Sequence, residues 1–259
     1  MENIREILQK LLTGKCDIKE TEKLLKANMI EEVGELAKLD IFRKHRTGIV
    51  EVIYAEHKTP EILLDIIKSF LEKNRFAIVS RYKEEQLNLI KQKLTNNESY
   101  QIETNNLAKL IIITAKDFEF KKKGGIIGII TAGTSDIPVA EEAKVIAQSM
   151  GCEVISSYDL GIAGIHRIFN PLSEMVKNGV QVIIVCAGME GTLPGVVAAL
   201  VDIPVIGVPI SSGYGLGEKG LGALTTMLQS CSPGLLVVNI DNGFGAGASA
   251  ALIANQSRK

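Results

Sequence analysis

The feature that most constrains this sequence is a compact strand, loop, helix and strand between Val182 and Pro209. Residues 182–185 are all apolar and β-branched, which is typical of a strand buried on both faces of a parallel sheet. The chain then passes through a glycine-rich loop at 188–195 into a predicted helix and returns as the apolar strand 205–208. Ligands of open α/β sheets bind at the carboxyl edge of the strands, so this run predicts both a fold class and the position of a site.

The same alternation extends from Gly125 to the end of the chain. The predicted strands are 126–130, 153–157, 180–186, 205–208 and 235–239, and the predicted helices are 138–150, 168–177, 193–200, 217–229 and 243–254. Five strand–helix units with short connections require right-handed crossovers and a parallel sheet covered on both faces. Residues 124–259 are therefore predicted to form a three-layer α/β/α doubly wound domain.

The first half of the chain predicts a smaller α/β domain over residues 1–123. Amphipathic helices are expected at 4–12 and, with weaker patterns, at 18–26 and 30–39, followed by a strand at 49–54. Thr59 and Pro60 indicate the start of a helix, and further strands and helices alternate up to Thr114. The charged segment 117–123 before Gly124-Gly125 marks the expected domain boundary.

Composition excludes several classes of protein. With 46% hydrophobic and 23% charged residues and a net charge of −1, the chain has globular composition and no general nucleic-acid or membrane surface. No leader and no long uncharged apolar run is evident, so a cytoplasmic location is expected. The four cysteines lack metal-finger spacing and are expected to be reduced thiols.

Two glycine-containing loops offer candidate binding groups. Gly133, Thr134, Ser135 and Asp136 follow the first strand of the second domain, where hydroxyl and backbone donors converge on a phosphate or ribose; a plain helix cap is the alternative. After the central strand, Gly188, Met189, Glu190 and Gly191 place a carboxylate among backbone donors. Glu190 either caps the helix or acts in catalysis. Neither loop has the spacing of a dinucleotide-binding G-x-G-x-x-G motif.

Three further places carry chemically capable side chains. His166 and Arg167 precede a helix and can handle a proton and grip a phosphate, respectively. Cys231 follows a helix and is expected to be partly exposed, either as a nucleophile or as a structural thiol. Asp241 and Asn242 offer oxygen ligands for a hard cation such as Mg²⁺, or a simple turn.

Taken together, these loops resemble the PurE family of aminoimidazole ribonucleotide carboxylases and mutases. The matching pieces are Gly133-Thr134-Ser135-Asp136, His166-Arg167, Leu193-Pro194-Gly195 and the run 204–209. The sequence departs from that family at Gly164-Ile165, where Ser-Ala is usual, and at Glu190-Gly191-Thr192, where Ala-Ala-His is usual.

Those departures, with Arg46-Thr47-Gly48 and the ending Asn239-Ile240-Asp241-Asn242, look like the LarB family. That resemblance implies a carboxylase/hydrolase that converts nicotinic acid adenine dinucleotide, CO₂ or bicarbonate and water into pyridinium-3,5-biscarboxylic acid mononucleotide and AMP. The product begins synthesis of the nickel-pincer nucleotide cofactor of lactate racemase and passes to downstream cofactor-synthesis enzymes. The resemblance also implies Mg²⁺ with no organic cofactor, and a homo-oligomer, by analogy with PurE an octamer.

The resemblance assigns roles to the candidate residues. Cys231 matches the nucleophile that adds to the pyridinium ring, and Glu190 matches a carboxylate that transfers a proton, with His166 as a second candidate. Ser135, Asp136 and Arg167 would hold the ribose phosphate, and Asp241 would bind Mg²⁺ or nucleotide. Two alternatives stay open: a purine-type carboxylase or mutase, which needs no cysteine, and a nucleotide-binding regulator without activity.

Overall fold

The computed structural model describes residues 4–27, 31–33, 37–39, 43–94 and 99–257 of the chain. The chain divides into two compact units. The first comprises 1–103 and 112–118, and the second comprises 104–111 and 119–259. Within the described ranges, no helix is long and apolar enough to span a bilayer.

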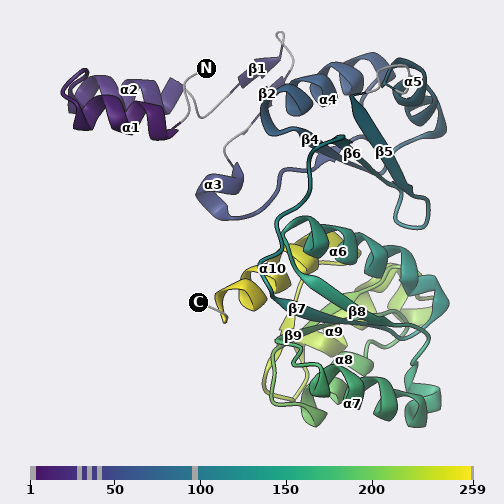
Figure 1. The fold of residues 1–259 in the computed structure, drawn as a ribbon. Coiled ribbons are helices and arrows are strands. Elements are labelled where there is room, and N and C mark those ends of the chain that lie inside the picture. The colour runs from purple at the N-terminus through teal and green to yellow at the C-terminus, as the bar shows by residue number, and fades with distance from the viewer. Residues whose placement is uncertain (1–3, 28–30, 34–36, 40–42, 95–98, 258–259) are drawn as a thin grey trace. The chain divides into compact units, whose positions relative to one another are not determined.

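The first unit contains most of a four-stranded sheet of order β3-β4-β6-β5, in which β3 and β4 are parallel; the end of β5 and the start of β6 fall within 104–111. Its elements in Figure 1 are α1 (Ile4–Leu12), α2 (Ile18–Ala27), β1 (Glu31–Val33), β2 (Ala37–Leu39), α3 (Arg43–Thr47), β3 (Ile53–Tyr54), α4 (Pro60–Asn74), β4 (Phe76–Ser80), α5 (Glu84–Leu94), β5 (Tyr100–Asn105) and β6 (Leu110–Ala115). Thr59 caps α4 by accepting a hydrogen bond from the Ile62 backbone, as the Thr-Pro pair predicted.

Two predictions for this unit are wrong. The segment 30–39 was expected to be helical, but Glu31–Val33 and Ala37–Leu39 form an antiparallel strand pair. Apolar and charged residues alternate in Ala37-Lys38-Leu39, so the period of two prevails there over the weak helical pattern. Residues 30 and 34–36 of this prediction lie outside the described residues. The strand expected over 49–54 is confined to Ile53–Tyr54.

One buried side chain holds the loops of the first unit together. Gln86 on α5 is fully buried, and its amide group donates to the carbonyl oxygens of Ala55 at 2.8 Å and Lys58 at 2.7 Å. Its oxygen accepts from the backbone of Lys83 at 2.8 Å. The loops that follow β3 and β4 are thus fixed by one residue that satisfies its hydrogen bonds inside the core.

The second unit confirms the predicted three-layer α/β/α fold with a parallel sheet. Its elements are β7 (Ile126–Thr131), a 3₁₀ turn (Thr134–Asp136), α6 (Ile137–Ser149), β8 (Glu153–Ser157), a 3₁₀ segment (Ile162–Ile168), α7 (Phe169–Lys177), β9 (Val182–Ala187), α8 (Leu193–Leu200), β10 (Val205–Pro209), a 3₁₀ segment (Gly215–Gly220), α9 (Leu221–Leu228), β11 (Leu235–Val237) and α10 (Gly243–Gln256). The predicted helix 217–229 begins only at Leu221, because Glu218 and Lys219 have non-helical backbone angles among several glycines.

The five strands lie in the order β11-β10-β9-β7-β8. Ile127 pairs with Val154 of β8 on one side and with Val182 of β9 on the other. The chain therefore reverses its direction of travel across the sheet at β7, and the crevice between β7 and β9 is the switch point at which such sheets bind ligands.

Helices cover both faces of this sheet, with α6 and α10 on one face and α7, α8 and α9 on the other (Figure 1). The small residues of the Gly- and Ala-rich helix α10 pack on α6. A Cβ atom on Gly247 would lie 2.4 Å from the carbonyl oxygen of Ala143. On the other face, Leu172, Met175, Val197 and Met227 enclose the core.

Candidate active site

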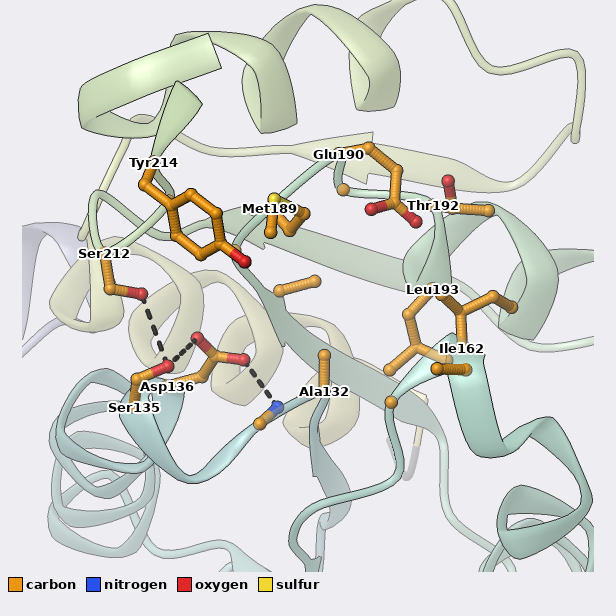
Figure 2. Close-up of a pocket in the computed structure, with 17 residues that line it drawn as sticks. Ala132, Ser135, Asp136, Ile162, Met189, Glu190, Thr192, Leu193, Ser212 and Tyr214 are labelled. Carbon is orange, nitrogen blue, oxygen red and sulfur yellow. Dashed lines mark hydrogen bonds between the residues drawn. The ribbon is translucent and has the colours of Figure 1, made fainter. Parts of the chain in front are cut away.

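A pocket of about 330 Å³ lies at the carboxyl edge of the sheet, at the switch point. Its lining comes from the loops after all four strands β7 to β10: Ala132, Gly133, Ser135, Asp136, Gly161, Ile162, Ala163, Ala187, Gly188, Met189, Glu190, Gly191, Thr192, Leu193, Ser212, Gly213 and Tyr214 (Figure 2). The sheet topology thus gathers the glycine-rich loops singled out in the sequence into one cavity.

Asp136 lines the pocket and is only 2% exposed. Its carboxylate accepts hydrogen bonds from the backbone of Gly133 at 2.8 Å and the hydroxyl of Ser135 at 3.3 Å (Figure 2). Burial raises the pKa of Asp136, opposed by hydrogen bonds from the backbones of Gly133, Gly188 and Ala132 and from Ser135. Asp136 is therefore a fixed acceptor that can bind a ligand hydroxyl, while the neighbouring Thr134 lies outside the lining.

The turn after β9 presents Glu190 to the pocket. Met189 and Gly191, on either side of it, both have positive φ values, 44° and 75°. This conformation leaves Met189 and Glu190 exposed while Gly191 is buried. Figure 2 shows the Glu190 carboxylate directed toward Thr192 at the edge of the cavity. Glu190 does not cap α8: Thr192 precedes that helix, and no side-chain cap is made there.

His166 and Arg167 lie outside the lining of this pocket, and both are exposed. Arg167 forms an ion pair with Asp159 at 2.9 Å. Its guanidinium lies against Gly164, where a Cβ atom would be 2.7 Å from Nε. The absence of a side chain at Gly164 thus allows the close approach of the Arg167 side chain.

Asp241 and Asn242 also lie outside the lining and support neighbouring loops. Asp241 accepts a hydrogen bond from the backbone of Ser211 at 2.9 Å, so it fixes the loop after β10. Asn242 caps α10 through a hydrogen bond from Gly245 at 2.8 Å. Their structural roles match the turn alternative raised for these residues.

Cys231 lies in a second pocket, of about 360 Å³, between α8 and the end of α9. The two pockets share Gly191 and Thr192 as a common rim. Cys231 is exposed, and the first turn of α8 lies beside it because Gly195 has no side chain: a Cβ atom there would be 2.8 Å from Oγ of Ser230. The amino end of α8 therefore adds partial positive charge to the pocket that holds the thiol.

The part of the chain that the structure describes contains no preformed cluster of metal ligands. No group of three or more His, Cys, Asp or Glu residues is close enough to hold an ion there. Mg²⁺ commonly binds through one or two carboxylates and substrate phosphates, and Asp241 is already engaged with Ser211. Mg²⁺ therefore stays a prediction from the resemblance.

Sequence reasoning missed Ser212 and Tyr214. Ser212 donates to Ser135 at 3.3 Å and so joins the loops after β10 and β7. Tyr214 reaches over the pocket in Figure 2. The sequence did indicate that these residues belong to the site, since Ser211-Ser212-Gly213-Tyr214 follows a buried strand at the same sheet edge as the other loops.

Comparison with known proteins agrees with this architecture. Residues 126–259 match the AIR carboxylase family, and residues 30–116 match the LarB/PurE-like N-terminal domain. A protein of Methanocaldococcus jannaschii, described as uncharacterized protein MJ0165, is 48% identical over 99% of both chains. The N5-carboxyaminoimidazole ribonucleotide mutase of Thermotoga maritima is 36% identical over 49% of this chain and 73% of its own.

The fold and the pocket at its switch point thus define an AIR carboxylase-like α/β protein. With the N-terminal domain that accompanies it, the chain belongs to the LarB family, as the sequence motifs indicated.

Proposed function

We propose that the protein carboxylates C5 of the pyridinium ring of nicotinic acid adenine dinucleotide and hydrolyses its phosphoanhydride, giving pyridinium-3,5-biscarboxylic acid mononucleotide and AMP. The observation that carries the proposal is the pair of pockets joined at Gly191 and Thr192, one holding Glu190 and the other an exposed thiol, Cys231. A purine-type mutase has no use for that thiol.

The thiol activates the pyridinium ring for carboxylation. A pyridinium ring is electron-poor, so its C5 cannot attack CO₂. Addition of the Cys231 thiolate to C4 forms a C–S bond and gives a neutral dihydropyridine, whose C5 is an enamine carbon and therefore nucleophilic. C5 then bonds to CO₂, loses its proton to a base, and the C4–S bond breaks with its electron pair leaving on sulfur. The net change replaces one ring hydrogen by a carboxylate and releases one proton.

The pocket residues supply binding and proton transfer. Glu190, next to the shared rim, is the base that removes the C5 proton, since it is the exposed carboxylate of the lining. Asp136 and Ser135 bind the ribose hydroxyls next to the ring. The pocket volume of about 330 Å³ suits one mononucleotide half, so the AMP half extends beyond it.

Assembly into a homo-oligomer belongs to the same proposal. Leu200, Leu228 and Leu236 are exposed by 47%, 66% and 51% on α8, α9 and β11, and the first two directly follow Ala199 and Met227, which line the Cys231 pocket. A second copy that covers these leucines would also exclude water from the thiol. Native mass spectrometry tests this, because a single species of 28.0 kDa would contradict it.

The decisive experiment is incubation of the purified protein with nicotinic acid adenine dinucleotide, Mg²⁺ and ¹³C-bicarbonate, followed by mass spectrometry. We expect a labelled dicarboxylated mononucleotide and AMP from the wild type and from Cys16→Ala, and neither product from Cys231→Ala. Full activity of Cys231→Ala would disprove the thiol mechanism.

A purine-type mutase is the second candidate, favoured by the similarity of residues 126–259 to AIR carboxylases. Conversion of N5-carboxyaminoimidazole ribonucleotide that survives in Cys231→Ala would support it. Tight binding of the dinucleotide with no turnover of either substrate would indicate a nucleotide-binding regulator instead.

A further inference from the structure

The charges of the first pocket suit a cation better than an anion. Among the described residues of its lining, Asp136 and Glu190 carry charge and no Lys, Arg or His occurs. Arg167, the nearby cation expected to reach a phosphate, is paired with Asp159 outside the lining. Two carboxylates without a cation favour a ligand group that carries positive charge.

Two exposed apolar side chains border the same pocket. Tyr214 is 76% exposed and Met189 is 45% exposed. Figure 2 shows the Tyr214 ring extending over the cavity next to Met189, opposite Glu190. An aromatic face beside carboxylates is the arrangement by which proteins recognise organic cations, because the face of the ring is electron-rich.

The loop that carries Tyr214 is fixed on one side and free on the other. Ser211 is held by Asp241 at 2.9 Å, and Ser212 donates to Ser135 at 3.3 Å. Gly213 packs on the Met189 backbone, where a Cβ atom would lie 3.3 Å from the nitrogen. At Gly215, just after Tyr214, φ is +77° and an added Cβ atom would meet nothing within 4 Å. The ring can therefore adjust onto a ligand while its attachment stays in place.

We propose that Tyr214 is a specificity residue that stacks on the substrate ring and selects its positively charged, pyridinium form over a neutral ring of the same shape. This inference rests on the proposed function. It identifies the positive charge of the ring as the property of the substrate that the site recognises. An aminoimidazole ring or a dihydropyridine, being neutral, gains less from Tyr214 and the two carboxylates.

The test compares two ligands that differ in ring charge, oxidised and 1,4-dihydro nicotinamide mononucleotide. Binding is measured by calorimetry on the full-length Cys231→Ala protein without bicarbonate, so that no covalent adduct or product forms. We expect the oxidised form to bind more tightly, with a preference that Tyr214→Phe retains. Tyr214→Leu should lower that preference roughly 2- to 30-fold, the range of a cation–π contact.

Leu216→Ala is the matched control, since Leu216 lies two residues further along the same loop, is fully exposed and does not line the pocket. It should leave the preference unchanged. An unaltered preference in Tyr214→Leu, equal affinities in the parent protein, or no binding of either ligand would overturn the proposal. If product still forms in the carboxylation assay, only the role of Tyr214 has failed; if no product forms, the proposed function has failed as well.

Discussion

Gly191 lies so close to Ala223 that a Cβ atom on Gly191 would be 2.6 Å from the Ala223 carbonyl oxygen. This contact joins the turn after β9 to the first turn of α9. Because Gly191 also forms the rim common to both pockets, the position of Cys231 relative to Glu190 depends on it.

Replacement of Gly191 by alanine should therefore affect stability and activity together. The side chain meets backbone at 2.6 Å in a residue with φ +75°, and both costs add to about 2–4 kcal/mol of unfolding free energy. Urea denaturation measures the loss. Gly179→Ala is the control, because Gly179 has φ +71° in open space and should cost only about 1 kcal/mol. Equal losses in both variants would refute the contact argument.

Asp136 should make the stability of the protein depend on pH. Burial raises its pKa in the folded state, so its contribution is fully present below the unfolded pKa and is lost as the pH rises through the folded value. The unfolding free energy of the wild type minus that of Asp136→Asn should thus be larger near pH 4 than near pH 7. Ser135→Ala removes a hydrogen bond that lowers the Asp136 pKa, so it should make the difference between pH 4 and pH 7 larger. A difference that is constant or grows with pH would show that hydrogen bonds outweigh burial.

The cysteines should differ in reactivity toward iodoacetamide in the native protein. Cys231 is exposed, whereas Cys152 and Cys186 are buried, and burial raises the pKa of the Cys186 thiol. Peptide mass mapping over time should find Cys231 modified first and Cys186 modified only after unfolding. Bound nicotinic acid adenine dinucleotide should protect Cys231, and modification that is unaffected by the dinucleotide would argue against a ring beside the thiol.

Gln86 should be important for the stability of the first unit. Gln86→Leu keeps the volume but leaves the carbonyl oxygen of Lys58 and the N–H of Lys83 without their partner. It also removes one of the two hydrogen bonds to the Ala55 carbonyl oxygen, which keeps the bond from the Lys58 backbone. We expect a loss of about 2–4 kcal/mol in the unfolding free energy. Gln92→Leu, on an exposed position of the same helix, should change it by less than about 0.5 kcal/mol. A small effect of Gln86→Leu would mean that the loops are held by other contacts.

Local sequence patterns were sufficient to predict an element wherever one residue type determines the backbone conformation. The β-branched run 182–185 forms a buried strand, and Thr59-Pro60 begins a helix as predicted. They failed at 30–39, where a weak helical period competed with alternation, and at 217–220, where glycines interrupt the helix expected there. The loop sequences were also sufficient to identify the family, because its motifs lie at fixed places relative to the strands.

The sequence by itself determined the parallel sheet, its two layers of helices, the sheet edge at which a site forms, and most of the side chains there. Only the tertiary structure decided which of them meet: Asp136 and Glu190 in one pocket with Tyr214, Cys231 in the next, and His166, Arg167, Asp241 and Asn242 outside both linings. The physical reason is that strand order and loop packing are set by long-range contacts, such as that of Gly191 with Ala223. Spacing along the chain does not encode these contacts.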